Sequence, residues 1–368
     1  MHSALVYTRC PDIEIVAFCD TAPGRAEEAA ARFKRETGGD APAFSSHKAA
    51  AENCAYDAAY IACPPDIQAE IACLEMERGI HVMTQVPAAF TLDECWALVD
   101  TVKKTGVIYV LAEQTRYWDF IRRWRKMAKQ GGFGKIVYAE GAYLHYEPRW
   151  DFFTDSKTGR PVVTADAAYH NDPRYRQSWR YKVFAEPIFY LPHTLGPLLS
   201  VTGGKISKVA CLGTRTGGYR YEGFDVCDLQ EAVMYNTNDI VFSVKAGFTT
   251  PHGLNLLTGA HWYQIKGTEG SAETPRGETD FGKLWTKPGG WERADWSCVP
   301  EDADEFTRNI SHGGADLEPL LQFVRAVGGI AEPEMDVYAA VETAAPAILA
   351  ARSCRMGGVM TEVPDFRV

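Results

Sequence analysis

One stretch decides the fold class: Ile13-Glu-Ile-Val-Ala-Phe-Cys19, an apolar run that is followed at once by Asp20. A strand that ends in a carboxylate in this way is typical of the second half of a dinucleotide-binding unit. The first half, a strand and a Gly-x-Gly-x-x-Gly turn, is expected about 20 residues earlier. Met1–Tyr7 stands near that place and is interpreted as the tail of the helix that follows such a turn. We therefore expect a nucleotide-binding enzyme whose first strand and glycine-rich loop are absent from the chain as given.

Apolar strands and helices alternate through the first third of the chain. Strands are predicted at 13–19, 57–63, 81–85 and 107–111, and helices at 23–34, 66–78, 91–106 and 117–130. The third of these helices opens with the capping box Thr91-Leu-Asp-Glu94 and ends at Gly106. Because this alternation indicates a parallel sheet covered on both faces, residues 1–116 are expected to form an α/β, Rossmann-like dinucleotide-binding domain.

The pattern changes after Lys135. Long strands are predicted at 136–145, 205–214, 226–237, 239–249 and 259–267, and two closing helices at 316–327 and 335–352. The turns between these strands indicate an antiparallel or mixed sheet, so residues 117–368 are expected to form an α+β domain, with the helix at 335–352 packing back on the first domain. Residues 146–181 are polar, aromatic and too long for a simple connection, and are a candidate substrate loop or lid.

Composition excludes several partners. The 368 residues carry a net charge of −10, which argues against binding to nucleic acid or to an anionic membrane surface. The sequence has no apolar run of about 18 residues that could span a membrane. Its ten cysteines show neither a C-x-x-C pair nor zinc spacing, so no metal is expected, and Cys19, Cys63 and Cys73 are interpreted as buried, reduced thiols. A cytoplasmic protein is expected, although an upstream segment could carry an export signal.

Candidate cofactor residues stand at the ends of three predicted strands. Asp20 can accept hydrogen bonds from ribose hydroxyls, which favours NAD over NADP. Cys63-Pro64-Pro65 and Gln85-Val86-Pro87 end two further strands, where ligands of parallel sheets collect. A turn at Asp20 and simple strand termination at the prolines are the alternatives.

Tyrosine and histidine side chains are the candidates for proton transfer. Tyr143 and His145 end the first strand of the second domain, and Tyr190-Leu-Pro-His193 opens a helix. A Tyr/His pair in one pocket can take and return the proton of a hydroxyl group. The alternative is aromatic packing with a helix-capping histidine.

Further residues are candidates for contact with substrate. Arg149, Trp150, Trp179 and Arg180 suit stacking on a sugar and hydrogen bonding to its hydroxyls, or they belong to a solvated loop. His312 either caps the helix that follows or lines the same cleft.

The landmarks occur in an order that resembles the glucose-fructose oxidoreductase/inositol dehydrogenase/MocA (Gfo/Idh/MocA) superfamily over nearly the whole chain. The matching stretches are Ile15-Val-Ala-Phe-Cys-Asp20, Ala62-Cys-Pro-Pro-Asp66, Gly79-Ile-His-Val-Met-Thr-Gln-Val-Pro87, Gly134-Lys-Ile136 and Ile265-Lys-Gly-Thr-Glu-Gly270. The resemblance implies a Rossmann domain, a second domain with an open-faced sheet that pairs with a copy of itself, NAD(P), and sugar or cyclitol substrates. The predicted cofactor set also includes Arg116.

Within this superfamily the chain resembles the NAD-dependent α-N-acetylgalactosaminidase branch. The stretches are Val86-Pro-Ala-Ala-Phe-Thr-Leu-Asp-Glu-Cys-Trp96, Glu140-Gly-Ala-Tyr-Leu-His145, Tyr190-Leu-Pro-His-Thr-Leu-Gly-Pro197 and His312-Gly-Gly314. The resemblance assigns catalytic roles to Tyr143, Tyr190 and His193. It also implies a redox-neutral cleavage: oxidation at C3, removal of the C2 proton by Tyr143 or by His193 through water, loss of the C1 group, addition of water and re-reduction.

One departure concerns proton transfer. Ordinary dehydrogenases of the superfamily carry Glu-Lys-Pro, whose lysine relays the hydroxyl proton, whereas this chain has Gln85-Val86-Pro87. Valine has no proton to exchange, so the role falls to Tyr190 or His193, or is lost. A simple NAD(P)-dependent sugar or cyclitol dehydrogenase is therefore the second hypothesis, and a non-catalytic sugar-binding or scaffold protein is the third.

Overall fold

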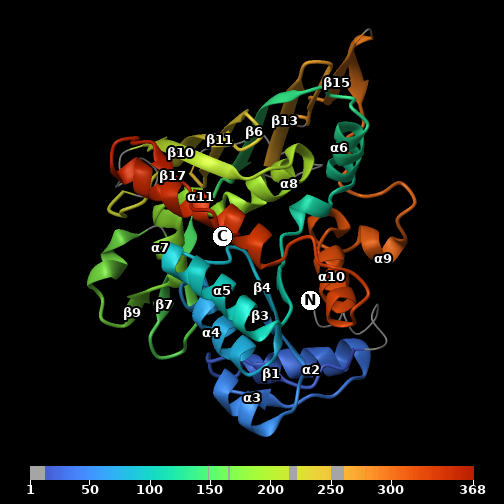
Figure 1. The fold of residues 1–368 in the computed structure, drawn as a ribbon. Coiled ribbons are helices and arrows are strands. Elements are labelled where there is room, and N and C mark those ends of the chain that lie inside the picture. The colour runs from blue at the N-terminus through green and yellow to red at the C-terminus, as the bar shows by residue number, and fades with distance from the viewer. Residues whose placement is uncertain are drawn as a thin grey trace.

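Figure 1 shows short parallel strands and their helices at one end of the molecule and a large sheet at the other. The computed structural model describes residues 13–147, 149–164, 166–214, 222–249, 261–277, 279–287 and 289–368. The helix tail expected at Met1–Tyr7 and the strand residues expected at 259–260 lie outside the described residues.

The N-terminal part is built from parallel strands. β1 pairs with β2, and β4 lies between β3 and β5 in a second sheet. The strands are β1 (Phe18–Cys19), β2 (Ala43–Phe44), β3 (Ala58–Ile61), β4 (His81–Thr84) and β5 (Tyr109–Leu111). The helices between them are α2 (Arg25–Thr37), α3 (His47–Asn53), α4 (Pro65–Glu77) and α5 (Leu92–Thr105). The predicted alternation of strand and helix is confirmed.

Local sequence signals set the ends of α5. The Thr91 side chain accepts a hydrogen bond from the Glu94 backbone, and the Glu94 carboxylate accepts one from the Thr91 backbone, as the capping box predicts. Gly106 ends the helix with φ of 70°, a left-handed conformation that a side chain would oppose.

Two predictions at the first strand were wrong. Of the strand expected at 13–19, only Phe18–Cys19 forms ladder contacts, because its described neighbour β2 is itself two residues long. Neighbouring strand residues face opposite sides. Phe18 packs against Phe33 of α2, with ring centroids 5.4 Å apart, so the Cys19 side chain faces the other way and is exposed rather than buried. Cys63 and Cys73 are half-buried.

The second part is built on a nine-stranded sheet with the order β16-β15-β14-β13-β6-β12-β11-β10-β17. Every neighbouring pair is antiparallel except β6 and β12, so the expected largely antiparallel sheet is confirmed. The strands are β6 (Ile136–Leu144), β10 (Ile206–Gly213), β11 (Leu229–Asn236), β12 (Ile240–Gly247), β13 (His261–Gly267), β14 (Gly270–Glu273), β15 (Gly282–Thr286), β16 (Gly290–Ala294) and β17 (Thr361–Glu362).

The segment expected as a long loop at 146–181 is folded. It contains β7 (Trp150–Asp155), β8 (Pro161–Thr164), η2 (Ala167–Asn171), β9 (Tyr175–Gln177) and the start of α7 (Trp179–Ala185). The strands form a separate antiparallel sheet with the order β8-β7-β9. Phe152, Phe153 and Phe224 are buried together beneath it, which explains why an aromatic-rich segment did not remain irregular.

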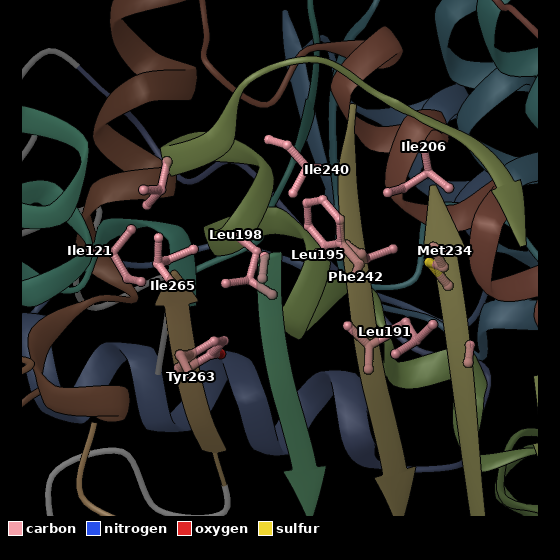
Figure 2. Packing of buried hydrophobic residues seen from close by; sticks show 14 of the residues in the cluster. Ile121, Leu191, Leu195, Leu198, Ile206, Met234, Ile240, Phe242, Tyr263 and Ile265 are labelled. Atoms are coloured by element: carbon pink, nitrogen blue, oxygen red, sulfur yellow. The ribbon is translucent and has the colours of Figure 1, made fainter. Parts of the chain in front are cut away.

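Helices cover one face of the large sheet. Leu195 and Leu198 of α8 pack over Phe242 of β12 and Ile265 of β13 (Figure 2). The remaining helical elements are η1 (Thr115–Tyr117), α6 (Asp119–Lys129), η3 (Pro187–Tyr190), α8 (Pro192–Thr202), α9 (Glu305–Arg308), η4 (His312–Gly314), α10 (Leu317–Val327) and α11 (Val337–Arg355).

Helix α11 belongs to two hydrophobic cores. Its first half, including Val341 and Ala344, packs with residues of α5 and β5. Its second half, including Leu349 and Ala350, joins the core under the large sheet. The helix thus connects the two parts of the molecule. Neither it nor any other helix in the described part of the chain combines the length and apolar character needed to cross a membrane.

Candidate active site

Three residues from separate elements meet at one point. The Tyr143 ring of β6 lies 5.4 Å from the ring of Tyr190 in η3 and 5.3 Å from that of His193 in α8. The interplanar angles are 5° and 24°, so the rings stack. The structure thus brings together all three side chains to which the sequence assigned catalytic roles.

Gly141 allows this approach. A Cβ atom at Gly141 would lie 2.3 Å from Cγ2 of Thr194, so α8 could not pack as closely on β6 if residue 141 had a side chain. Thr194 follows His193 in the first turn of α8. The close contact therefore sets how near His193 comes to Tyr143.

Two further histidines surround Tyr143. His145 lies 4.6 Å and His261 4.7 Å from its ring, measured between centroids. Burial lowers the pKa of His261 well below its usual value, and the positive charges of His193 and His145 lower it further. His261 is therefore a neutral ring with its Nδ1 atom 3.0 Å from the Tyr263 hydroxyl.

The environment keeps the Tyr143 hydroxyl protonated. Burial raises its pKa well above the usual value for tyrosine, and the negative charges of Tyr190 and Glu113, when ionised, raise it further. A phenol of this kind suits hydrogen-bond donation and proton return more than proton removal. Between the two candidates for the base, the environment thus favours His193 over Tyr143.

Glu113 is a residue that the sequence reasoning missed. It follows β5, is fully buried, and its Oε2 atom lies 2.8 Å from Nδ1 of His193. Burial raises the pKa of Glu113, but the nearby His193, when protonated, and the hydrogen bonds from Thr115 outweigh burial, so the pKa lies below its usual value. The signal was a carboxylate just after a parallel strand, the same signal that identified Asp20.

His312 joins the site through Trp118. Its Nδ1 atom is 2.9 Å from Oδ1 of Asp316, and this hydrogen bond raises the pKa of His312. Its backbone oxygen accepts a hydrogen bond of 2.9 Å from Nε1 of Trp118, whose ring meets His261 edge to face at 5.0 Å. The N-cap of α10 is Asp316, so His312 does not itself cap that helix.

The arginine and tryptophan candidates differ in position. Arg180 lies over the Trp179 ring at 4.5 Å from its centroid, and its charge acts on Tyr143. Arg149 is exposed. The side chain of Trp150 lies outside the described part of the structure, although its backbone begins β7. Arg180 is therefore the member of this set that the structure relates to the ring cluster.

Asp20 stands beside a cavity at the end of β1. Its Oδ1 atom accepts a hydrogen bond of 2.8 Å from the Ala22 backbone, which forms the turn into α2. The cavity has a volume of about 400 Å³ and is lined by Ala22, Pro23, Arg25, Glu28, Thr158, Gly159, Arg160 and Pro161. Residues of the β7–β8 hairpin thus face the end of the first strand.

The proline-containing turns lie at the carboxyl ends of β3 and β4. The Gln85 amide donates to the Tyr60 hydroxyl at 2.9 Å. Buried Gln68 donates to the backbone oxygens of Gln85 and Pro87, at 2.6 and 2.9 Å, and so fixes this turn. At the other turn, Pro64 caps α4 and Pro65 begins it, and burial raises the pKa of Cys63 to about 11.

Arg116 makes contacts within the protein. Its Nε atom is 3.1 Å from Oε2 of Glu334, and its Nη1 donates to the Gly196 backbone oxygen at 3.2 Å. These contacts tie η1 to α8, and the predicted contact of Arg116 with cofactor stays a prediction.

The remaining cofactor candidates fit a dinucleotide. An acidic side chain and a cavity lie at the end of β1, and the turns at Cys63–Pro65 and Gln85–Pro87 border the same edge of the parallel strands. Ligands of such sheets bind outside the carboxyl ends of the strands, with the adenosine and nicotinamide at different strand ends.

Comparison with known proteins agrees with this fold. Residues 1–113 match the family described as "Oxidoreductase family, NAD-binding Rossmann fold". "Glycosyl hydrolase family 109 protein 1" of Bacteroides thetaiotaomicron is 26% identical, with 98% of this chain and 80% of the relative covered. A protein of the same name from Bacteroides fragilis is 30% identical over 72% of this chain and 56% of its own length. A levoglucosan dehydrogenase solved with NADH and levoglucosan has a TM-score of 0.74 at 20% identity, covering 98% of this chain and 95% of its own, which shows a shared fold.

The fold defines a class, namely two-part oxidoreductases in which a Rossmann-type NAD-binding unit is joined to a unit built on a largely antiparallel sheet. Residues 1–113 match the Gfo/Idh/MocA oxidoreductase family model. The chain as a whole is similar to glycosyl hydrolase family 109 proteins.

Proposed function

We propose that the chain is an NAD-dependent enzyme that acts on sugars or glycosides and uses His193 as its proton-transfer group. The observation that carries this proposal is the buried pair of Glu113 and His193, which stands against the Tyr143 and Tyr190 rings just beyond the carboxyl end of β5. In this proposal residues 1–116 bind the cofactor, and residues 117–368 bind the substrate.

When bound, NAD supplies a hydride acceptor and, in its reduced form, a hydride donor for a sugar carbon. Asp20 would hold the adenosine ribose, and the turns at Cys63–Pro65 and Gln85–Pro87 would border the nicotinamide. Arg116 is left out of this set, because its guanidinium is already bonded to Glu334 and Gly196.

His193 takes the role that lysine has in ordinary dehydrogenases of the superfamily. Its Nδ1 atom faces Glu113, so its Nε2 atom is the nitrogen left for a substrate proton. Tyr143, kept neutral by burial, donates a hydrogen bond and returns a proton. Arg180 and Trp179 are the stacking and hydroxyl-binding candidates beside them.

We further propose that the reaction is redox-neutral cleavage of a glycoside. The names of the curated relatives support it. A ketone at C3 of the sugar makes the C2 proton acidic, because the carbanion delocalises into the carbonyl group. His193 passes the C3 hydroxyl proton to solvent and then removes the C2 proton, and the C1 leaving group departs with a proton from Tyr143. Water then adds at C1 and its proton restores Tyr143, His193 returns its proton to C2, and C3 returns to its original oxidation state.

The purified chain should be tested on nitrophenyl glycosides, beginning with the α-N-acetylgalactosaminide. We expect nitrophenol release without net formation of NADH, and strong loss of release in His193→Ala. Stoichiometric accumulation of NADH from a free sugar would instead identify a simple dehydrogenase. Sugar binding without turnover in a preparation that carries cofactor would identify a non-catalytic protein.

Cofactor binding can be measured independently of turnover. The purified chain is denatured and the released nucleotide is separated by chromatography. We expect near-stoichiometric NAD(H) and little NADP(H). A preparation that neither releases nor rebinds NAD would contradict the assignment of Asp20 and the two proline turns.

We also propose that the large sheet pairs with a second copy of the chain. On the face opposite α8 and α11 it exposes Leu212, Val233 and Val241, by 65%, 49% and 41%. Apolar side chains exposed on one face of a sheet mark a candidate interface. Light scattering should show a dimer or larger oligomer, and Val233→Glu should reduce the measured mass.

A further inference from the structure

The carboxylate of Glu113 lies where it can control the ring of His193. We propose that Glu113 is a positioning residue, which fixes the ring orientation and the tautomer of His193 and so connects the cofactor-bearing strand β5 to the proton-transfer group. This inference rests on the proposed function, because it assigns a partner to the same histidine.

The two oxygens of Glu113 have different partners. Oε1 accepts a hydrogen bond of 2.9 Å from the Thr115 backbone, while Oε2 lies 2.8 Å from Nδ1 of His193. The Thr115 hydroxyl also lies within hydrogen-bonding distance of Oε1. Because a backbone N–H always donates, the carboxylate cannot turn away without losing this bond, and Oε2 stays 2.8 Å from Nδ1 of His193.

The backbone of His193 is held as well. In a regular helix the His193 carbonyl would accept a hydrogen bond from residue 197, but residue 197 is a proline and has no N–H. The Tyr263 hydroxyl donates to this carbonyl at 2.7 Å, and the Thr115 hydroxyl is 3.0 Å away. The single proton of Thr115 can serve either this carbonyl or Glu113. The proline therefore leaves an acceptor that β13 and η1 occupy.

The packing leaves little room for the pair to move. A Cβ atom at Gly196 would lie 2.8 Å from Cγ of Glu113, so α8 rests directly on the glutamate side chain. The Gly196 carbonyl is held in turn by Arg116, which pairs with Glu334. Fixed orientation of this kind resembles the carboxylate–histidine pairs that hold catalytic and metal-binding imidazoles elsewhere.

Other groups around His193 do not offer the same partner. Tyr143, Tyr190 and His261 face its ring, and His145 and His312 lie further out in the cluster. Two of these groups are tyrosines, which are neutral phenols, and the other three are histidines. Among the groups that these contacts place around His193, Glu113 therefore supplies the carboxylate. The removal of its charge is therefore expected to change the pH profile of turnover.

The variant Glu113→Gln tests this role. The Thr115 N–H still requires an acceptor at the Oε1 position, so the glutamine places its NH₂ group toward Nδ1 of His193. Nδ1 then becomes an acceptor and the proton moves to Nε2, which can no longer act as the base. We expect kcat to fall about 10- to 100-fold with little change in KM. The acid limb of the pH profile should move to lower pH, because the imidazolium loses its partner charge.

Two variants serve as controls. Glu113→Asp keeps the charge and should recover part of the activity. Glu75→Gln removes another buried carboxylate, one that pairs with Arg78 on α4, and should leave the pH profile unchanged.

Nitrogen NMR of histidine-labelled protein gives a readout that does not require turnover. We expect the Nε2–H tautomer of His193 in Glu113→Gln and the Nδ1–H tautomer in the wild type. An unchanged tautomer together with an unchanged pH profile would overturn the inference. If the wild type shows no turnover on any sugar, the proposed function fails, while the tautomer measurement still decides whether Glu113 positions His193.

Discussion

The hydroxyl group of Tyr143 lies among rings that exclude water, and this decides which proton-transfer role it can take. Because burial holds its pKa well above the usual value for tyrosine, it stays protonated at neutral pH. Removal of this hydroxyl should therefore affect proton return, whereas proton removal by His193 should persist.

We expect Tyr143→Phe to lower kcat by about 10²-fold or more, in line with the loss of a general acid. The remaining activity should keep the pH profile of the wild type below about pH 10, because the lost group does not titrate there. Tyr138→Phe is the matched control, since it removes a hydroxyl from the same strand that is bonded to Glu140. Equal effects of the two substitutions would count against the assignment.

His312 gives a prediction about stability and pH. Its pKa is raised in the folded protein by the hydrogen bond to Asp316. A raised pKa means that the folded state binds the proton more tightly. The contribution to stability is therefore fully present below the unfolded value of about 6.5 and is lost as the pH rises through the folded value.

We expect His312→Gln to lower Tm more at pH 5.5 than at pH 8.5. The exposed His170→Gln should show no such difference. Thermal unfolding of the three proteins at both pH values is the measurement, and an equal loss at both pH values would contradict the coupling to Asp316.

At the scale of single elements, the contact between β6 and α8 leaves no room for a side chain at residue 141. Gly141→Ala would place a Cβ atom 2.3 Å from Cγ2 of Thr194. We expect a loss of about 1–3 kcal/mol in the free energy of unfolding, measured with urea, because a packed interface must separate. Thr194→Ser deletes the clashing methyl group, so the double variant should recover most of this loss. Simple additivity of the two substitutions would show that the contact is not the cause.

The sequence predicted well those elements whose ends are marked by their own capping residues. The capping box at Thr91–Glu94 and the glycine at 106 fixed α5 to within a residue. The strands β14 to β16 were missed because they are only four or five residues long and pair with their neighbours in sequence. The segment at 146–181 has the sequence character of a loop because it contains prolines and many polar residues, and its buried partner Phe224 lies far along the chain.

At the scale of the whole molecule, α11 makes the two parts dependent on each other. Leu349→Ala removes a side chain that is 2% exposed from the core under the large sheet. We expect it to cost about 2–5 kcal/mol. Because the same helix packs on α5 and β5, hydrogen exchange should become faster in β4 and β5 as well as in β10. Faster exchange confined to β10 would show that the two parts of the molecule open separately. The control Ile330→Ala, at an exposed position, should change the exchange rate in neither part.

The sequence alone determined the order of elements, the parallel first part, the largely antiparallel second part and the candidates Asp20, Tyr143, Tyr190 and His193. These follow from hydrophobic periodicity, caps and strand-end residues, which act over a few neighbouring positions. Only the tertiary structure decided that Glu113 faces His193, and that Thr115 and Tyr263 lie at the His193 carbonyl, from 78 and 70 residues away in sequence. Such pairs depend on how a strand end, a helix and a distant strand pack together, and the burial that makes them strong arises only when the parts meet.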